Sequence, residues 1–200
     1  MNKTRSLLSW AAVFVAGFLA GVFFAAWKLD TVTPGRAPKM EAREQNAQTE
    51  LQARVAGLEK MLAAKPNDLN ATIQLGNDYF DLGNHQKAVE YYEKALHIDP
   101  RNPDVMTDMG ISYRKLGKPD ESIKAFKKAL EIDPKHAMAL FNMGIVLRDD
   151  LKDDEGALAA WESFLKVAEE SPHAVMIRPW VKQLKEKIAA SSTTKGSEHK

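Results

Sequence analysis

Leu75-Gly76-Asn77-Asp78-Tyr79 returns 34 residues later as Met109-Gly110-Ile111-Ser112-Tyr113. The same spacing relates Gly83 to Gly117, and Ile98-Asp99-Pro100 to Ile132-Asp133-Pro134. A fixed period of this length is typical of a helical repeat, in which stacked neighbours bury the apolar side of each unit. Such an array favours holding another molecule over catalysis.

The amino-acid composition excludes several classes of function. The 200 residues, 44% of them hydrophobic, leave room for one main domain and an appendage. Lys+Arg 28 against Asp+Glu 27 gives a net charge of +1, so we expect no nucleic-acid partner. The sequence has no cysteine, which excludes disulfides, thiolate catalysis and Cys-ligated metals. Because phosphate loops and nucleophile elbows are also missing, we expect neither an enzyme nor a cofactor.

The amino terminus predicts a membrane anchor. Residues 7–27 are apolar or small apart from Ser9, and as a helix they span roughly 32 Å. A cleaved signal peptide is the alternative, and Lys3 and Arg5 suit its positive region. Its apolar part is usually shorter, about 7 to 15 residues, and a clean cleavage site is missing, which favours an uncleaved anchor.

Topology follows from the short basic tail, residues 1–6, which we expect to stay in the cytoplasm. The repeats are then periplasmic, on a single-pass protein of a bacterial inner membrane. Basic residues on the two sides nearly balance, so charge alone favours this orientation only weakly. Gly17, Gly21 and Ala25 lie on one helix face in a small-xxx-small pattern, which lets two membrane helices approach closely and form a homo-oligomer. The alternative is that glycine and alanine are simply common in membrane helices.

Residues 28–50 are expected to form a partly helical linker. Two prolines and a glycine between Thr31 and Pro38 interrupt a helix, whereas Met40 to Ala64 lacks proline and is rich in helix formers. One apolar stripe runs along this segment: Leu51, Val55, Leu58 and Leu62. It either starts a short coiled coil or, over residues 51–66, covers the first repeat as a half repeat.

At these positions the chain resembles the tetratricopeptide repeats. That family's pattern has a large apolar residue before Gly, an aromatic three residues after it, then Ala, aromatic, Ala and Pro. Repeat one, residues 67–101, matches with Leu75, Gly76, Tyr79, Gly83, Ala88, Tyr92, Ala95 and Pro100. Repeat two, residues 102–135, matches with Met109, Gly110, Tyr113, Gly117, Ser122, Phe126, Ala129 and Pro134. Repeat three, residues 136–171, is irregular, with Met143, Gly144, Ala157, Trp161 and one inserted residue between Arg148 and Glu155.

The resemblance implies an all-α, right-handed solenoid of three helix pairs with flanking helices, preceded by one transmembrane helix. We expect pairs at 69–82 with 85–98, 103–116 with 119–132, and 137–149 with 154–169. A capping helix is expected at 172–190 and a disordered tail at 191–200. Gly76, Gly110 and Gly144 each cost roughly 1 kcal/mol of helix propensity relative to Ala, so a partner helix should approach closely there.

In this family the first helices of the pairs line a concave groove that takes peptide segments. By resemblance the lining positions are Asn70, Ile73, Asn77, Phe80, Asp104, Thr107, Ile111, Arg114, Met138, Phe141, Ile145 and Arg148. Several are large and apolar, and contiguous exposed apolar surface usually marks a binding site. The alternative is that the amino-terminal or carboxy-terminal helix folds over the groove and buries it.

Some family members grip a terminal carboxylate with Lys, Asn and Arg side chains. This chain keeps Asn77 but has Ile73, Asp108 and Met138 where that clamp would want Lys, Asn and Lys. We therefore do not expect recognition of that type. Arg114 and Arg148 either pair with a carboxylate or are solvated.

Two motifs have simpler explanations. Asp149-Asp150-Leu151-Lys152-Asp153 matches the magnesium-diphosphate motif of isoprenoid synthases, but a single copy in a connection favours helix capping by Asp153. Four histidines lie in or beside turns at no metal-ligand spacing, so we expect isolated surface side chains and no metal site: His85, His97, His136 and His173.

The sequence thus predicts a membrane-anchored scaffold or adaptor that binds a peptide segment of a partner protein, in assembly of a membrane or periplasmic complex. The alternative is a structural homo-oligomerisation element at the membrane. The order of anchor, linker and short repeat domain is similar to bacterial accessory proteins of cytochrome c maturation and nitrite reductase assembly, although no residue indicates heme handling.

Overall fold

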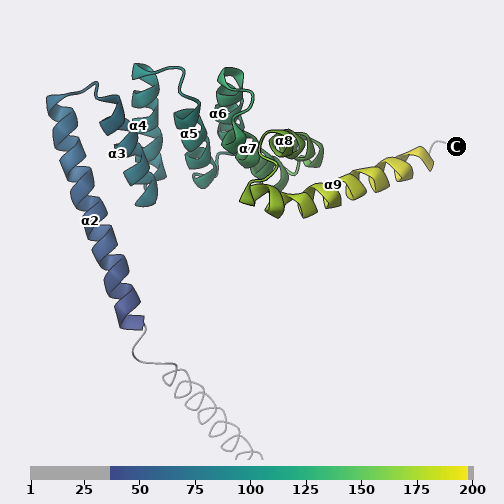
Figure 1. Ribbon diagram of the computed structural model, residues 1–200, viewed down its shortest axis with the longest axis horizontal. Coiled ribbons are helices and arrows are strands. Elements are labelled where there is room, and N and C mark those ends of the chain that lie inside the picture. Colours follow the sequence, from purple (N-terminus) through teal and green to yellow (C-terminus); the bar gives the residue numbers. More distant parts are fainter. Residues whose placement is uncertain (1–36, 198–200) are drawn as a thin grey trace, which may run out of the picture. The chain divides into compact units, whose positions relative to one another are not determined.

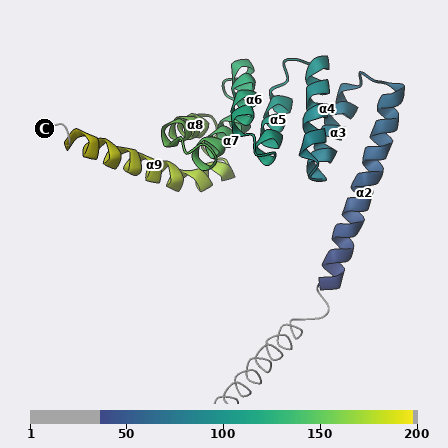
Figure 2. The same cartoon turned by 180° about the vertical axis from the view of Figure 1, so that it is seen from behind.

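The computed structural model describes residues 37–197, and this range is helical, without a strand. Within this range, residues 51–197 belong to one compact unit, and α2 begins before that unit. The helices are α2 (Ala37–Ala64), α3 (Leu69–Asp81), α4 (His85–Ile98), α5 (Pro103–Lys115), α6 (Pro119–Ile132), α7 (Ala137–Asp149), α8 (Asp154–Val167) and α9 (Pro172–Ser197). Helices α3 to α8 follow one another side by side in chain order (Figures 1 and 2).

The three expected helix pairs are present, and each helix begins at the expected residue. Local chemistry explains these starts. The side chains of Asp68, Asn84 and Asn102 each accept a hydrogen bond from a backbone N–H in the first turn of α3, α4 and α5. Pro103 and Pro119 occupy the first positions of α5 and α6, where the missing N–H is not needed.

Each helix pair crosses at its glycine, as the sequence predicts. A Cβ atom on Gly76 would lie 2.6 Å from Cε1 of Tyr92, closer than real Cβ atoms come. The aromatic ring therefore fills the space that a glycine leaves, and the close approach offsets the loss of helix propensity. The same contact recurs in every pair: Gly76 with Tyr92, Gly110 with Phe126, and Gly144 with Trp161.

The third pair differs in its connection. Gly83 and Gly117 have φ angles of 74° and 70°, in the left-handed region that favours glycine. Between α7 and α8 this conformation falls on Lys152, with φ 59°, because the expected inserted residue lengthens the turn. A non-glycine residue in this region costs about 1 to 2 kcal/mol.

The stripe on α2 covers the first pair, as one of the two interpretations predicts. Val55 lies in the same buried cluster as Leu75 and Tyr79, and Leu58 and Leu62 pack against that cluster. An ion pair adds to this contact, because Arg54 donates two hydrogen bonds to the buried carboxylate of Asp78, at 2.7 and 2.5 Å.

The carboxylate of Asp78 is ionised in this setting. Burial would raise the pKa of Asp78, but hydrogen bonds from Arg54 and Gln74 outweigh it and hold the pKa below its ordinary value. The second half of α2 is therefore fixed to α3 by charge as well as by apolar contacts.

Helix α9 closes the other end of the array. Its buried side chains Ala174, Ile177, Val181 and Leu184 share a cluster with Trp161 of the third pair. A helical repeat needs such a cap, because its last unit otherwise exposes an apolar face.

Both flanking helices are longer than expected. Helix α2 begins at Ala37 and not at Met40, because Pro38 lies in the first turn, where its missing N–H breaks no helical hydrogen bond. Helix α9 continues to Ser197, so the expectation of a disordered tail over 191–200 is wrong as far as that residue. Once a helix exists, each added residue gains a hydrogen bond, and Ala190 is followed by no proline.

The predicted tail at residues 1–6, the span at 7–27 and the Gly17/Gly21 face lie outside the described residues. Between residues 37 and 197, no helix combines the length and apolar character that crossing a membrane requires.

The first helices of neighbouring pairs contact each other directly. Helix α3 contacts α5, and α5 contacts α7, whereas within the described range no comparable contact joins α4 to α6 or α6 to α8. Closer spacing of the first helices makes their side the inner, concave face of the array. The groove residues that the sequence predicts all lie on these three helices.

Candidate binding groove

A hollow of about 300 Å³ lies on the concave side, between the first two pairs. We call it the groove, and its lining comes from α3, α4 and α5: Asn77, Phe80, Asp81, Tyr92, Asp108 and Ile111. Three of the predicted residues, Asn77, Phe80 and Ile111, are thus brought together around one cavity.

The floor of the groove is held by the core. Tyr92 is 2% exposed, and its hydroxyl donates a hydrogen bond of 2.7 Å to Oδ1 of Asn77. This bond fixes the Asn77 amide and leaves its N–H groups as donors for a ligand carbonyl. Burial, followed by the nearby charges of Asp108 and Asp81, raises the pKa of Tyr92, so the hydroxyl stays protonated.

One wall of the groove is aromatic. The ring of Phe80 lies 5.0 Å from the ring of His85, measured between centroids. Burial and then the charge of Lys115 lower the pKa of His85, so this histidine is neutral near pH 7. Its Nδ1 atom is buried without a hydrogen-bond partner in the described part of the chain.

Asp108 is the most perturbed carboxyl group in the groove. Burial and then the neighbouring charge of Asp104 raise the pKa of Asp108 to about 6, although His136 offsets part of this effect. Among residues 37–197 its carboxylate accepts no hydrogen bond. A half-buried carboxylate without a partner is costly, and such groups are concentrated at functional sites.

The two predicted arginines are held by the chain's own acids. The guanidinium group of Arg114 lies 2.5 Å from Asp150 and 3.6 Å from Asp149. Arg148 lies 2.6 Å from Asp149, and its guanidinium group stacks on the ring of Trp180 at 4.0 Å. Both arginines are therefore neutralised within the fold.

These ion pairs also explain the acidic motif that runs from Asp149 to Asp153. Its first two residues pair with arginines, and Asp153 accepts a hydrogen bond of 2.8 Å from the backbone N–H of Gly156. The expectation that Asp153 caps a helix is confirmed. In the described part of the chain no group of His, Asp and Glu side chains is arranged to hold a metal ion.

Two of the predicted groove residues belong to the core. Thr107 is 2% exposed, and its hydroxyl donates to the carbonyl of Pro103 one turn earlier in the same helix. Phe141 is 6% exposed, because its ring packs against Phe164 and against His173 of α9. The interpretation that the carboxy-terminal helix buries the concave face therefore holds for the third pair, but not for the groove.

The remaining predicted positions lie away from the groove. Asn70 and Met138 are exposed, Ile73 and Ile145 are partly buried against the apolar core, and Asp104 is exposed. Asp104 lies 2.8 Å from Nε2 of His136.

The expectation of isolated surface histidines is wrong for three of the four. Nδ1 of His136 accepts a hydrogen bond from the backbone N–H of Ala139 and caps α7, while Nε2 faces Asp104. His85 and His173 pack against phenylalanine rings. Only His97 is an exposed side chain without a contact of this kind in the described range.

Sequence reasoning missed Asp81, Tyr92 and Asp108 as groove residues. Tyr92 belongs to the repeat pattern and was interpreted only as packing, whereas its hydroxyl reaches across to Asn77. Asp108 departs from the residue that a carboxylate clamp would need. This difference could have identified Asp108 from the sequence, because a charged residue at a half-buried position is costly without a function.

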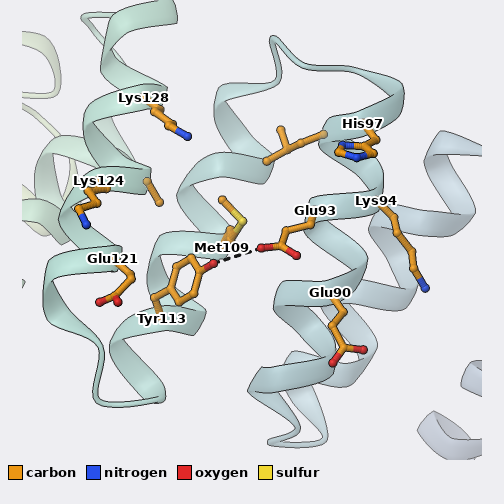
Figure 3. Close-up of a pocket in the computed structure, with 11 residues that line it drawn as sticks. Glu90, Glu93, Lys94, His97, Met109, Tyr113, Glu121, Lys124 and Lys128 are labelled. Atoms are coloured by element: carbon orange, nitrogen blue, oxygen red, sulfur yellow. Dashed lines mark hydrogen bonds between the residues drawn. The ribbon is translucent and has the colours of Figure 1, made fainter.

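A larger hollow of about 630 Å³ lies between α4, α5 and α6 and shares no lining residue with the groove (Figure 3). We call it the α4–α6 hollow. Glu90 and Glu93 come from α4, and Lys124 and Lys128 come from α6. Nothing in the sequence analysis anticipated this hollow.

Together, the stacked helix pairs, the capped ends and the open concave face define a helical-repeat protein. Tetratricopeptide-repeat models match residues 70–102 and 103–136, and a further tetratricopeptide-repeat model matches residues 125–159. Residues 70–159 therefore match the tetratricopeptide repeat. Comparison with curated proteins by sequence finds no match.

Solved structures share this fold. The crystal structure of MamA has a TM-score of 0.58 at 18% identity, over 75% of this chain and 95% of MamA. The Sgt2 TPR domain from Aspergillus fumigatus has a TM-score of 0.56 at 23% identity, over 63% of this chain and 82% of that domain. The first TPR of Spaghetti (RPAP3), bound to the HSP90 peptide SRMEEVD, has a TM-score of 0.55 at 21% identity, over 60% and 93% of the two chains. At these identities the likeness concerns the fold alone.

Proposed function

We propose that this chain is a membrane-anchored scaffold that binds a peptide segment of a partner protein in the groove. The observation that carries the proposal is the groove itself. It is an open cavity on the concave face, with apolar side chains from Phe80 and Ile111 and with the carboxylate of Asp108, which accepts no hydrogen bond from residues 37–197. Pockets of this composition, mostly preformed, are typical of ligand sites.

The solved neighbours support this proposal by analogy. The solved structure of the first TPR of Spaghetti holds a bound HSP90 peptide, and its fold covers 60% of this chain. A preformed groove between fixed helices lowers the conformational cost of binding, so a short segment suffices as a ligand.

The membrane part of the proposal depends on residues 7–27, whose length and apolar character suit a single span. Anchoring would place the repeats on the periplasmic side of a bacterial inner membrane and raise the effective concentration of membrane-bound partners. Protease treatment of intact cells and of cells with a permeable outer membrane tests this topology. Digestion of the repeats only after the inner membrane is opened would contradict it.

Assembly of a membrane or periplasmic complex, as in cytochrome maturation, is the role that we infer for such a scaffold. The alternative is a homo-oligomer held by the Gly17/Gly21 face. The α2 stripe supports it less than expected, because Val55, Leu58 and Leu62 are used to cover the first pair. Crosslinking on membranes distinguishes the two roles, since a homo-oligomer of this kind should be lost with Gly17→Leu.

Copurification from membranes tests the binding surface. We compare the full chain with Ile111→Glu in the groove and with Lys124→Glu in the α4–α6 hollow. Ile111→Glu should lose the copurifying proteins, and Lys124→Glu should retain them. Because Ile111 is partly buried, Asp81→Lys provides a second groove variant at an exposed position. Retention of every partner by both groove variants, with normal circular dichroism, would refute the proposal.

A further inference from the structure

The charges around the groove are unbalanced. Asp81 and Asp108 belong to its lining, and Asp104 lies next to Asp108 on the same helix. The imidazole of His136 faces Asp104 and Asp108, and its Nε2 atom is engaged by Asp104 at 2.8 Å. Of the two lining acids, Asp81 interacts electrostatically with Arg54, whereas Asp108 accepts no hydrogen bond from any residue between 37 and 197.

The cationic side chains of α5 and α7 interact with other groups. Arg114 pairs with Asp149 and Asp150, and Arg148 pairs with Asp149 while it stacks on Trp180. Lys115 is exposed at the end of α5 and acts on His85 at the aromatic wall. The groove therefore has uncompensated negative charge at the end formed by Asp108.

We propose that the groove selects a peptide segment by a basic side chain, lysine or arginine, and disfavours a terminal carboxylate. This inference rests on the proposed function and specifies the chemistry of its ligand. The occupant is an internal segment of a partner protein whose cationic group reaches Asp108, while its neighbouring apolar side chains contact Phe80 and Ile111.

Two contacts favour a cation there, and a third holds the ligand backbone. A guanidinium or ammonium group gives the carboxylate of Asp108 the charge-assisted hydrogen bond that no residue between 37 and 197 supplies. The ring of Phe80 adds a face on which a cation is attracted by the aromatic quadrupole. The N–H groups of Asn77, whose carbonyl is fixed by Tyr92, are available to a carbonyl of the ligand backbone.

A carboxylate in the same place meets the opposite field. It would lie beside Asp81 and Asp108, and like charges at close range disfavour binding by several kcal/mol in other interfaces. Ile73, Asp108 and Met138 stand where a carboxylate clamp would have Lys, Asn and Lys. These differences remove the clamp and also change the charge of the preferred ligand group from negative to positive.

Binding of a cation to Asp108 should depend on pH. The pKa of Asp108 is raised to about 6 by burial, so the carboxylate is ionised at about pH 7.5 and protonated at about pH 5. If only the ionised form binds, the affinity should fall about tenfold between these values. A carboxylate ligand would instead bind better as the pH falls.

Defined peptide pools provide the test. The full chain in detergent micelles is immobilised and presented with short acetylated and amidated peptides, randomised except for a central arginine, its neutral isostere citrulline, or glutamate. A fourth pool has central citrulline and a free carboxyl terminus. We expect the arginine pool to be retained about tenfold more than the citrulline pool at about pH 7.5.

Two variants assign this preference to the groove. Asp108→Asn keeps the size of the side chain and should abolish the preference for arginine, and Asp108→Lys should transfer it to the glutamate pool. Glu131→Gln removes the same charge at an exposed position on α6 and should leave the preference unchanged. Circular dichroism melts check that each variant is folded.

The outcomes separate the inference from the proposed function. Preference for the glutamate or free-carboxyl pool, lost in Ile111→Glu, would overturn the charge selectivity and leave the groove as the binding surface. Preference for arginine that survives Asp108→Asn would also overturn it. If the full chain and the Ile111→Glu variant retain every pool equally, the groove is not the binding surface, and the proposed function is contradicted as well.

Discussion

Replacing Asp108 with asparagine should make the protein more stable near pH 7. Burial raises the pKa of this carboxyl from the ordinary value of 3.8 to about 6, so the folded protein holds an ionised group in an unfavourable place. Asparagine has nearly the same shape and no charge. The substitution therefore removes the cost of the buried charge and keeps the packing of the groove.

The magnitude follows from the shift in pKa. A difference of about 2 units corresponds to about 3 kcal/mol as an upper bound, at 1.36 kcal/mol per unit. The groove is open to solvent, the attraction to His136 is lost, and the new amide still needs partners, so we expect a gain of about 1 to 2 kcal/mol. In urea this moves the unfolding midpoint upward by roughly 0.5 to 1 M.

The sign of the pH dependence provides the check. A carboxyl group whose pKa is higher in the folded state binds its proton more tightly when folded. Its contribution therefore destabilises the fold progressively as the pH rises from about 4 to about 6, and the loss is complete above that range. The advantage of Asp108→Asn should be largest at about pH 7.5 and should vanish at about pH 4.

Urea unfolding followed by circular dichroism at both pH values measures this difference, with Glu131→Gln as the control for loss of an exposed charge. Equal stability of Asp108→Asn and the unmodified chain at both pH values would show that Asp108 titrates as an ordinary surface carboxyl. The charge argument for the groove would then lose its basis.

Four further substitutions test the packing of the helices and one backbone conformation. Gly110→Ala should destabilise the fold by about 1 to 2 kcal/mol in thermal unfolding, because the new Cβ would meet the ring of Phe126 at 2.5 Å. Gly57→Ala is the matched control: its Cβ would have no neighbour within 4 Å, so the substitution should stabilise the fold by about 0.5 to 1 kcal/mol. Lys152→Gly should raise the unfolding midpoint by the equivalent of about 0.5 to 1 kcal/mol, since glycine accepts the positive φ of 59° without strain. A lower midpoint would show that the hydrogen bond from Nζ of Lys152 to the carbonyl of Asp149, at 2.7 Å, contributes more than the strain costs. Phe141→Ala should cost about 3 to 5 kcal/mol of stability if the residue belongs to the core, and a loss of binding with unchanged stability would return it to the groove.

The period of 34 residues determined most of the fold, because the repeat fixes both the packing residues and the caps. Each predicted first residue of a paired helix was right. In five of the six helices an Asp, Asn or His just before that residue accepts a hydrogen bond from a first-turn N–H, and in α6 the first residue is Pro119, which has no N–H. The ends of α2 and α9 were less predictable. Outside the repeats no periodic contact limits a helix, and its length depends on residues whose propensities differ little.

The groove was predicted in its apolar part and not in its charges. Asn77, Phe80 and Ile111 follow from their place on the first helices, and the structure brings them together. The burial of Phe141 depends on how His173 of α9 docks, which is a tertiary contact without a sequence pattern. The role of Asp108 depends on the arginines being paired with other acids, which no spacing rule specifies.

The central claim is that a partner segment lies in the groove and not in the larger α4–α6 hollow. A photo-crosslinking amino acid at position 111, compared with one at position 124, tests it on membranes under native conditions. Our account predicts partner adducts from position 111 and none from position 124. Adducts from position 124 alone would contradict it and move the binding surface to the hollow between α4 and α6.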